Sequence, residues 1–257
     1  MVASVRSYSL ESVVAGVGVG CVWRASDLAH PPADTVSSGF ESLDPQLPGG
    51  GWPRRSLTEL LSPQPGILEW RLLGPALRTI VAAGEQVVVI GPPKQPHLPG
   101  LRHEGIDERS LVWIQAETPA ERLWTVEQLV KASAAGALLA WLPQARPEQL
   151  RRLQVCAQGC DGPVFLMRPD AAKHEASAAP LRVRADFGLD WQLRVRVLKR
   201  RGPALEEEIV LPSIPGGLAA VLTPRLRKPS RLLAPHHRVE PLGSPVVQAR
   251  RRQLASQ

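Results

Sequence analysis

The sequence predicts an α/β protein with a mostly parallel central sheet, helices on both faces and antiparallel strands added at the C-terminal side. Short apolar runs of strand length alternate with longer segments of helical period between Ser37 and Met167, which is the order of elements in parallel sheets with right-handed crossovers. From Leu181 onward the hydrophobic period is two, which indicates antiparallel strands with one solvated face. With 257 residues, 44% of them hydrophobic, the chain can form one core domain and a tail.

The stretch from Ser37 to Ile90 has the outline of a nucleotide-binding strand, loop, helix and strand. Ser56–Leu61 is a short apolar strand, and Gln86–Ile90 is a continuous β-branched run of the kind covered on both faces. Gly66 lies where a phosphate-binding loop would pass into its helix. The helix between the strands has apolar residues at a 3.6-residue period, which predicts one face packed on the sheet. The residues expected to be buried there include Leu77 and Val88.

The phosphate-binding chemistry is missing from this loop. A phosphate-binding loop needs exposed backbone N–H groups, a Lys for the phosphates and a Ser or Thr for the metal, in the order G-x-x-x-x-G-K-[ST]. No Lys, Ser or Thr occurs between Pro63 and Leu77, and the prolines of the loop lack N–H groups. Glu69 also places a negative charge in the first helical turn, where a phosphate would be attracted. The degenerate loop is marked by Ser62, Pro63, Gly66 and Glu69, and we expect no cofactor there.

The residues of this unit resemble the RecA recombinase family. The matching runs are S-S-G-F-E-S-L-D from Ser37, G-G-G-W-P-R-R from Gly49 and G-E-Q-V-V-V-I from Gly84. More narrowly, V-W-R-A-S-D-L from Val22 and L-P-G-G-G-W-P from Leu47 resemble the ImuA family of RecA-like accessory proteins in bacterial mutagenic translesion synthesis. The resemblance covers the chain from Val22 to Gly217. It implies a RecA-like fold of the P-loop superfamily.

Two carboxylates that RecA-family ATPases use are also missing. In that family a Glu ends the second strand and orients the attacking water, but here the strand runs into Gly91-Pro92-Pro93. The fourth strand, predicted at Ala137–Leu142, should end in an Asp that holds Mg²⁺, yet no Asp or Glu occurs between Gln128 and Pro147. Positioning and electrostatics supply nearly all of phosphoryl-transfer catalysis, so the sequence predicts a pseudo-ATPase with no catalytic residues.

The remaining elements follow from local patterns. Thr118 and Glu121 form a capping box with a Pro between them, which predicts a helix start, and we expect Gly136 to close that helix. We expect a loop over Gly91–Gly105, where four prolines occur. The other predicted elements are a strand at Leu111–Gln115, a helix at Pro147–Gln158, a strand at Pro163–Met167 and a short helix around Ser26–Ala29.

The C-terminal half of the core carries alternating basic residues. Leu181–Phe187 and Trp191–Val197 predict two half-exposed strands with a basic outer face, and Ile209–Leu211 is expected to pair with them. This face is either a charge-paired solvated surface or a nucleic-acid surface. The family resemblance places a DNA-contacting loop at Arg168–Ala179, but its cations are Arg168 and Lys173 and it has no aromatic residue for stacking. A plain linker is the simpler interpretation.

The chain divides into an N-terminal helix or arm at 1–35, a core at 36–217 and a basic tail at 218–257. The tail from Thr223 onward has eight cations and one acid, which equals the whole net charge of +7. Low apolar content predicts that it is disordered in the free protein. The tail either docks on polymerase subunits, contacts DNA or only aids solubility. Its binding candidates are Arg225, Arg227, Lys228, Arg231, Leu232, Leu233, Arg250, Arg251 and Arg252.

Other sites are not favoured by the sequence. Two thiols, Cys156 and Cys160, are too few for a zinc site, and His97 and His103 lie in an irregular loop, so no metal is expected. Three cysteines suit a reducing cytosol. The apolar run from Leu10 to Cys21 is interrupted by Glu11, which favours an N-terminal arm over a signal segment. The sequence thus predicts a cytoplasmic protein with no membrane partner.

The resemblance implies a non-catalytic adaptor of SOS-induced mutagenic translesion synthesis after DNA damage. The implied partners are an ImuB-like Y-family polymerase homologue and an error-prone DnaE-type polymerase, with RecA and DNA as further candidates, at the nucleoid when the protein is active. The alternative is a cell-division inhibitor of the SulA type, which resembles a shortened RecA fold and binds FtsZ. The fuller nucleotide-core pattern from Ser37 to Leu142 and the long basic tail favour the adaptor.

Overall fold

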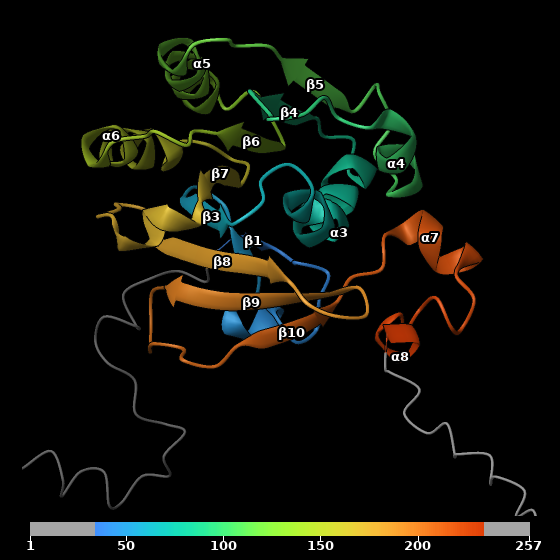
Figure 1. Cartoon of the computed structure of the whole chain (residues 1–257). Helices are drawn as coiled ribbons and strands as arrows, with labels where there is room; N and C mark the ends of the chain where they lie inside the picture. The colour runs from blue at the N-terminus through green and yellow to red at the C-terminus, as the bar shows by residue number, and fades with distance from the viewer. Residues whose placement is uncertain (1–33, 234–257) are drawn as a thin grey trace, which may run out of the picture.

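A computed structural model describes residues 34–233, and the fold is centred on one eight-stranded mixed sheet (Figure 1). Its strands are β3 (Leu57–Ser62), β4 (Val87–Ile90), β5 (Leu111–Ile114), β6 (Ala137–Trp141), β7 (Val164–Pro169), β8 (Leu181–Phe187), β9 (Gln192–Lys199) and β10 (Ile209–Pro212). They lie in the order β10-β9-β8-β3-β7-β6-β4-β5. The strands β3 to β8 pair in parallel, whereas β8, β9 and β10 pair antiparallel. The α/β class, the mostly parallel sheet and the added antiparallel strands are therefore confirmed.

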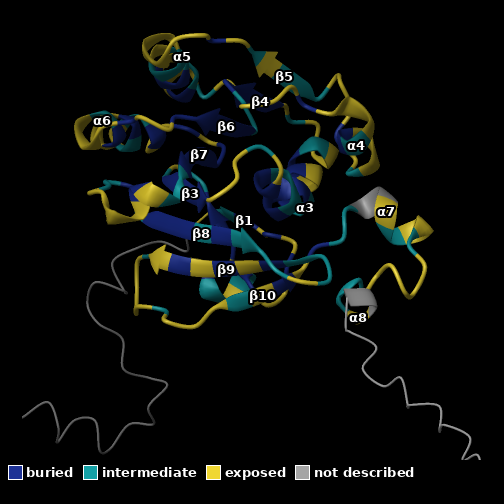
Figure 2. Ribbon diagram, in the orientation of Figure 1, coloured by how far each residue is buried: buried dark blue, intermediate teal, exposed yellow. Residues whose placement is uncertain are grey.

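Helices cover both faces of the sheet and divide the interior into two cores (Figures 1 and 2). One core lies under α3 (Leu68–Ala82) and α4 (Leu98–His103), and it continues along the inner face of β8, β9 and β10. The other lies under α5 (Pro119–Ala132) and α6 (Pro147–Ala157). Leu77 belongs to the first core and Val88 to the second, and both are buried as predicted.

The segment before β3 packs on the first core. It contains β1 (Thr35–Val36), which pairs antiparallel with β2 (Trp52–Pro53), and the 3₁₀ helix η1 (Asp44–Gln46). The Trp52 ring is fully buried edge-on against Phe165, with ring centroids 5.5 Å apart. Gly51 lies so close to this pair of strands that a Cβ would approach the Val36 carbonyl oxygen to 2.5 Å. The Gly49-Gly50-Gly51 run thus allows the chain to turn tightly beneath the sheet.

Two local expectations differ from the structure, each for a physical reason, and a third cannot be compared with it. The loop expected over Gly91–Gly105 contains α4, whose proline lies in the first turn, where a missing N–H costs nothing. Helix α5 ends at Ala132 with Ser133 in the left-handed region, so Gly136 does not close it. Gly136 is instead required by close packing, because a Cβ there would lie 2.4 Å from Glu85. The helix expected around Ser26–Ala29 falls outside the described residues.

The first part of the predicted basic tail is ordered. Helices α7 (Gly216–Val221) and α8 (Ser230–Leu233) follow β10 and pass beside the turn between β8 and β9. The backbone N–H and the hydroxyl of Ser230 donate to the Asp190 carboxylate at 2.8 and 2.7 Å, and the Trp191 indole donates to the Leu226 carbonyl at 2.9 Å. Polar bonds to a distant turn, rather than apolar burial, connect residues 223–233 to the core, and the composition of the segment gives no sign of these bonds.

Candidate functional site

The degenerate loop predicted from the sequence lies at the carboxyl ends of the parallel strands. In α/β sheets this edge is where ligands bind, because loops and helix N-termini converge there. The loop after β3, the end of β7, the end of β6 and the end of β4 follow one another along this edge. What these four strand ends carry therefore decides what chemistry the edge can perform.

Glu69 of α3 bends back onto the loop after β3 and accepts hydrogen bonds from it. The Gly66 backbone N–H donates to Glu69 Oε2 at 2.8 Å, and the Ser62 hydroxyl donates to Oε1 at 3.4 Å. The side chain is buried, and no cation in the described part of the chain forms an ion pair with it. Burial raises the pKa of the Glu69 carboxyl, although these hydrogen bonds partly offset the rise. A backbone donor of the kind that a phosphate would use is thus bound to a carboxylate of the chain itself.

Trp141 stands at the end of β6, where the family resemblance would place a metal-binding Asp. The indole is buried, and its ring centroid lies 6.3 Å from that of Trp70 on α3. Its N–H is near enough to Glu69 to lower the pKa of that carboxyl, although its geometry completes no regular hydrogen bond. An indole offers no oxygen ligand to Mg²⁺, which prefers carboxylates and water.

Gly91 directly follows β4, where the family resemblance would place a water-orienting Glu. Its φ is +57°, and a Cβ there would lie 2.7 Å from Cδ and Nε of Arg122. The Arg122 side chain therefore crosses directly over the end of this strand, and its Nε donates to the Ala116 carbonyl at 2.8 Å. Glycine is required here by both the backbone conformation and the close approach. The position holds a guanidinium in place of a carboxylate.

Arg71, the cation of α3 nearest to the loop, points away from it. Its Nη2 donates to the Trp191 carbonyl and to the Ser213 hydroxyl, each at 2.6 Å, and its guanidinium carbon lies 5.2 Å from the centroid of the Phe187 ring. Partial burial lowers the pKa of Arg71. This residue ties the helix that follows the loop to the antiparallel strands, so it cannot serve the loop as a phosphate-binding cation.

Arg168, a predicted binding candidate, is buried and paired within the sheet. It lies on β7, where its Nη1 donates to Glu59 at 2.8 Å and its Nη2 donates to Glu175 at 2.7 Å. Arg182 of β8 binds the other oxygen of Glu59, which is itself fully buried on β3. The prediction that Arg168 faces a partner is therefore wrong, because its guanidinium is buried and paired with two carboxylates inside the fold. The signal in the sequence was Glu59, a single acid in an otherwise apolar strand, which needs a buried partner.

The outer face of β8 and β9 is partly charge-paired, in line with the first of the two interpretations of this face. Arg184 pairs with Asp170 and Asp186, and Arg196 lies 3.7 Å from Glu208. The linker after β7 forms the 3₁₀ helix η2 (Asp170–His174), in which Lys173 pairs with Asp170 at 3.0 Å. The side chain of Lys173 is partly exposed, but its charge is also compensated.

The remaining candidates lie on the C-terminal segment. Arg225, Arg227, Lys228 and Arg231 are exposed. Arg227 bonds the Leu222 and Ala219 carbonyls, so it braces α7 rather than pointing freely outward. Leu232 and Leu233 belong to α8. The predicted cluster Arg250, Arg251 and Arg252 lies outside the described residues.

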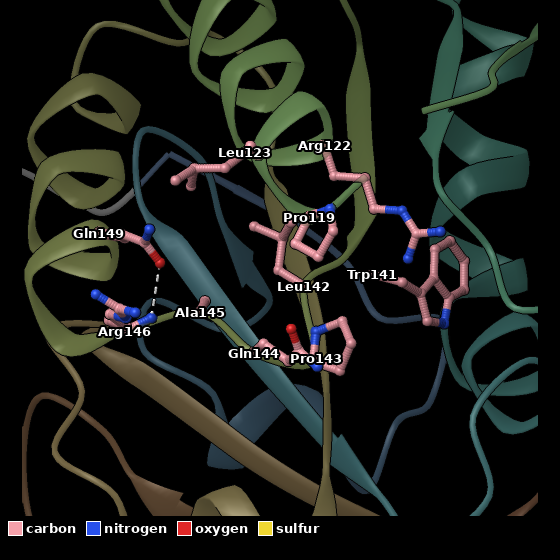
Figure 3. A pocket seen from close by; sticks show the side chains of 11 residues that line it. Pro119, Arg122, Leu123, Trp141, Leu142, Pro143, Gln144, Ala145, Arg146 and Gln149 are labelled. Atoms are coloured by element: carbon pink, nitrogen blue, oxygen red, sulfur yellow. Dashed lines mark hydrogen bonds between the residues drawn. The ribbon is translucent and has the colours of Figure 1, made fainter. Parts of the chain in front are cut away.

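A hollow opens at the end of β6, between the N-terminal ends of α5 and α6, and was not foreseen from the sequence (Figure 3). It encloses about 300 Å³. Its floor and walls are mostly apolar, and Arg122 and Arg146 lie on opposite sides of it. Its lining comes from two helices and the end of β6, which only the folded chain brings together.

Comparison with known proteins leaves the family open. No protein-family model matches the chain, and no curated protein sequence matches it at a significant level.

Two further findings concern the described residues. No helix within residues 34–233 is both long and apolar enough to span a bilayer. Within the same residues, no three His, Cys, Asp or Glu side chains are grouped so that they could hold a metal ion.

Proposed function

We propose that the chain is a catalytically silent, RecA-like accessory protein of the ImuA type, which acts as an adaptor in mutagenic translesion synthesis. The observation that carries the proposal is the contact between Glu69 and the Gly66 N–H, because a carboxylate occupies the loop donor that a phosphate would need. The proposed partners are an ImuB-like Y-family homologue and an error-prone DnaE-type polymerase, with RecA and DNA as further candidates. The proposed site of action is the cytoplasm, at the nucleoid.

The site lacks the groups for phosphoryl transfer, but the sheet and helices around it are intact. This combination supports an adaptor role. Trp141, Gly91 and Glu69 stand where a metal ligand, a water-orienting acid and a phosphate would be needed. Around them the parallel sheet and its helices are intact, with two continuous apolar cores. A fold that keeps its packing without the groups for phosphoryl transfer can still present surfaces to partners.

The C-terminal segment supports a partner-binding role. Arg225, Lys228 and Arg231 are exposed on residues 223–233, and none of the three has an ion-pair partner in the described part of the chain. Leu226 is also exposed, at 48%. Cations next to an apolar side chain suit an acidic protein surface, since the charges steer association and the apolar group gains from burial.

The proposal is tested by mixing the purified full chain with its proposed partners one at a time. We expect co-elution in size-exclusion chromatography with the ImuB-like homologue or with the DnaE-type polymerase, and no complex with FtsZ. Deletion of residues 223–257 should leave the core folded, as judged by circular dichroism, and remove the complex.

Two results would count against the proposal. A complex with FtsZ alone would favour the division-inhibitor alternative. Absence of any complex with the polymerase partners would remove the adaptor role.

The salt dependence of binding distinguishes DNA from protein as the partner. Each neutralised phosphate of duplex DNA contributes about −0.9 to the slope of the logarithm of the binding constant against the logarithm of the salt concentration.

A further inference from the structure

We propose that the hollow between α5 and α6 is a docking site for an acidic peptide segment of a partner protein, with an apolar side chain seated in the hollow and carboxylates bound by Arg122 and Arg146. The inference does not depend on the proposed role in lesion bypass, since it concerns only what this hollow accepts. The occupant is defined by its chemistry: acidic residues on both sides of one or more large apolar residues.

The hollow has the size and lining for an apolar side chain. Its volume of about 300 Å³ lies at the lower end of the usual range for ligand pockets. Apolar contacts come from Pro119 and Leu123 of α5, and from Leu142, Pro143 and Ala145 after β6. Leu142 and Ala145 are buried, so the floor of the hollow is part of the core and not a mobile surface.

The floor is also held from beneath. The Ala145 carbonyl accepts a hydrogen bond from Nη2 of the buried Arg168 at 2.9 Å, which ties the turn after β6 to the Glu59 ion-pair cluster. The turn is fixed at its other end by the Gln149 side chain, which accepts from the Arg146 N–H at 2.8 Å (Figure 3). A rigid hollow loses little conformational entropy when a ligand enters, which favours affinity.

The guanidinium group of Arg122 is fixed in a position from which it could bind an anion. Its Nε is bonded to the Ala116 carbonyl and its stem packs on Gly91, so the direction of its two terminal amino groups is set. No carboxylate in the described part of the chain forms an ion pair with it. The nearest acid on the same helix, Glu121, is occupied, because it accepts the N–H groups of Glu117 and Thr118 at the helix start. A fixed guanidinium fork suits a carboxylate of a ligand.

Arg146 supplies the second positive charge on the opposite side of the hollow (Figure 3). It is exposed at the N-terminal end of α6, and its guanidinium forms no ion pair with any described residue. The N-termini of α5 and α6 add their positive partial charges on the same side of the sheet. A ligand that bridges the hollow therefore meets a positive group at each end.

These features favour a peptide over a nucleic acid. Single-stranded nucleic acids need a basic track and exposed aromatic rings for base stacking. The aromatic residue of the lining, Trp141, is 4% exposed and is turned into the core. The two arginines are separated by apolar surface, whereas successive phosphates would need cations in a row. An acidic peptide with a central apolar residue matches the arrangement of the hollow, in which apolar surface lies between two positive charges.

The test uses fluorescence anisotropy with the full chain and fluorescein-labelled peptides. The probes are acidic pairs that flank Phe or Leu residues, such as Gly-Glu-Asp-Phe-Leu-Asp-Glu-Gly, in a panel that varies the number of apolar residues between the acids. Matched control peptides replace the apolar residues by Ser or the acids by Lys. We expect saturable binding of at least one acidic apolar peptide with a Kd on the order of 10–100 μM, and no saturation by either control.

Variants of the chain locate the site. Arg122→Ala and Arg146→Ala should each weaken binding about tenfold or more, as expected for loss of a hydrogen-bonded charge. Arg122→Lys keeps the charge without the fork and should lose less. Arg151→Ala removes an exposed arginine of α6 that does not line the hollow, so it should bind as the unmodified chain does.

The outcomes are decisive even if one variant is unstable. If Arg122→Ala unfolds, the exposed Arg146, tested as Arg146→Ala and Arg146→Glu against Arg151→Ala, still decides. Lack of saturation by the whole panel up to about 1 mM, or equal binding by the arginine variants and the control, would overturn the proposal. So would competition by an unlabelled thymidine oligonucleotide that shows the same dependence on Arg122, since it would make the hollow a nucleic-acid site.

Discussion

Two buried carboxylates lie ten residues apart in the same strand, loop and helix, and the chain treats them differently. Glu59 of β3 faces two guanidinium groups, from Arg168 and Arg182, and all three residues are less than 10% exposed. Glu69 of α3 has no cation in contact among the described residues and is held by the Gly66 N–H and the Ser62 hydroxyl. The first carboxylate is part of an internal ion-pair cluster, and the second is only hydrogen-bonded within the loop after β3.

The difference separates a buried charge that is paired from one that is only hydrogen-bonded. A buried ion pair with good geometry carries no net charge. Removing one partner leaves the other charge buried and uncompensated. A buried carboxylate held only by neutral donors keeps much of its desolvation cost, which is why the pKa of Glu69 is raised. The chain therefore tolerates a desolvation cost at the loop after β3 that it avoids within β3 itself.

The largest expected effect is the loss of Glu59. Glu59→Ala leaves Arg168 and Arg182 buried without their shared partner, so the free energy of unfolding should fall by about 3–5 kcal/mol. Urea denaturation followed by circular dichroism measures it. Glu148→Ala, at an exposed acid of α6, is the matched control and should change stability little. A loss under about 1 kcal/mol, as for a surface ion pair, would show that the cluster contributes little to the free energy of unfolding.

The packing of α3 beneath the loop gives the next effect. Leu77 is fully buried in the core between this helix and the sheet. Leu77→Ala should lower the free energy of unfolding by about 2–5 kcal/mol through lost burial and a cavity. Thr79→Ala, two residues away at an exposed position, serves as the control in the same thermal melts. An unchanged melting temperature for Leu77→Ala would contradict the placement of the helix.

The pH dependence of stability distinguishes Glu69 directly. Its folded pKa is raised above the ordinary value of 4.5, so the folded chain binds this proton more tightly than the unfolded chain. Its contribution to stability is thus fully present below pH 4.5 and is lost as pH rises through the folded pKa. Glu69→Gln removes this loss, so the variant should gain stability relative to the unmodified chain as pH rises over that range.

Chemical denaturation at a series of pH values measures the difference between Glu69→Gln and the unmodified chain. Glu148→Gln, at an exposed acid, controls for the change of charge. A difference that stays constant with pH, or that changes in the opposite direction, would mean that the Glu69 carboxyl is not destabilised by burial.

The smallest effect concerns the C-terminal segment. Asp190→Ala removes the acceptor of both Ser230 bonds, so residues 223–233 should be cleaved faster by trypsin at their basic residues while the core melts at nearly the same temperature. The Ser230 bonds lower the pKa of Asp190, so acid should release the segment as pH falls through that folded pKa. Glu41→Ala is the control, and equal cleavage in both variants would show that Asp190 does not hold the segment.

The sequence predicted the elements whose signals are local. The strands β3 to β7 were placed within one or two residues, because each is a short apolar run between turn residues. The start of α5 was predicted because the capping box of Thr118 and Glu121 is a four-residue pattern. The absence of phosphate-binding groups in the loop after β3 could be recognised from the sequence equally well, since it depends only on residue types at adjacent positions.

The features that were missed depend on contacts between distant segments. Arg168 and Arg182 were read as surface cations, because nothing near them in the chain indicates that both meet Glu59. The order of residues 223–233 depends on Asp190 and Trp191, in a turn whose positive φ values belong to residues that usually avoid them. The hollow beside Trp141 could not be predicted for the same reason, since two helices and a strand end form it.

The central claim is that the loop after β3 is closed to nucleotides by Glu69 and lacks the groups that bind them. Isothermal titration calorimetry with ATP and Mg²⁺ tests it on the full chain. The account predicts no saturable heat up to about 1 mM ligand, a Kd that corresponds to roughly −4 kcal/mol. A site with a Kd below about 100 μM that is lost on Gly66→Asp would contradict it, because the nucleotide would then occupy the loop that Glu69 is said to fill.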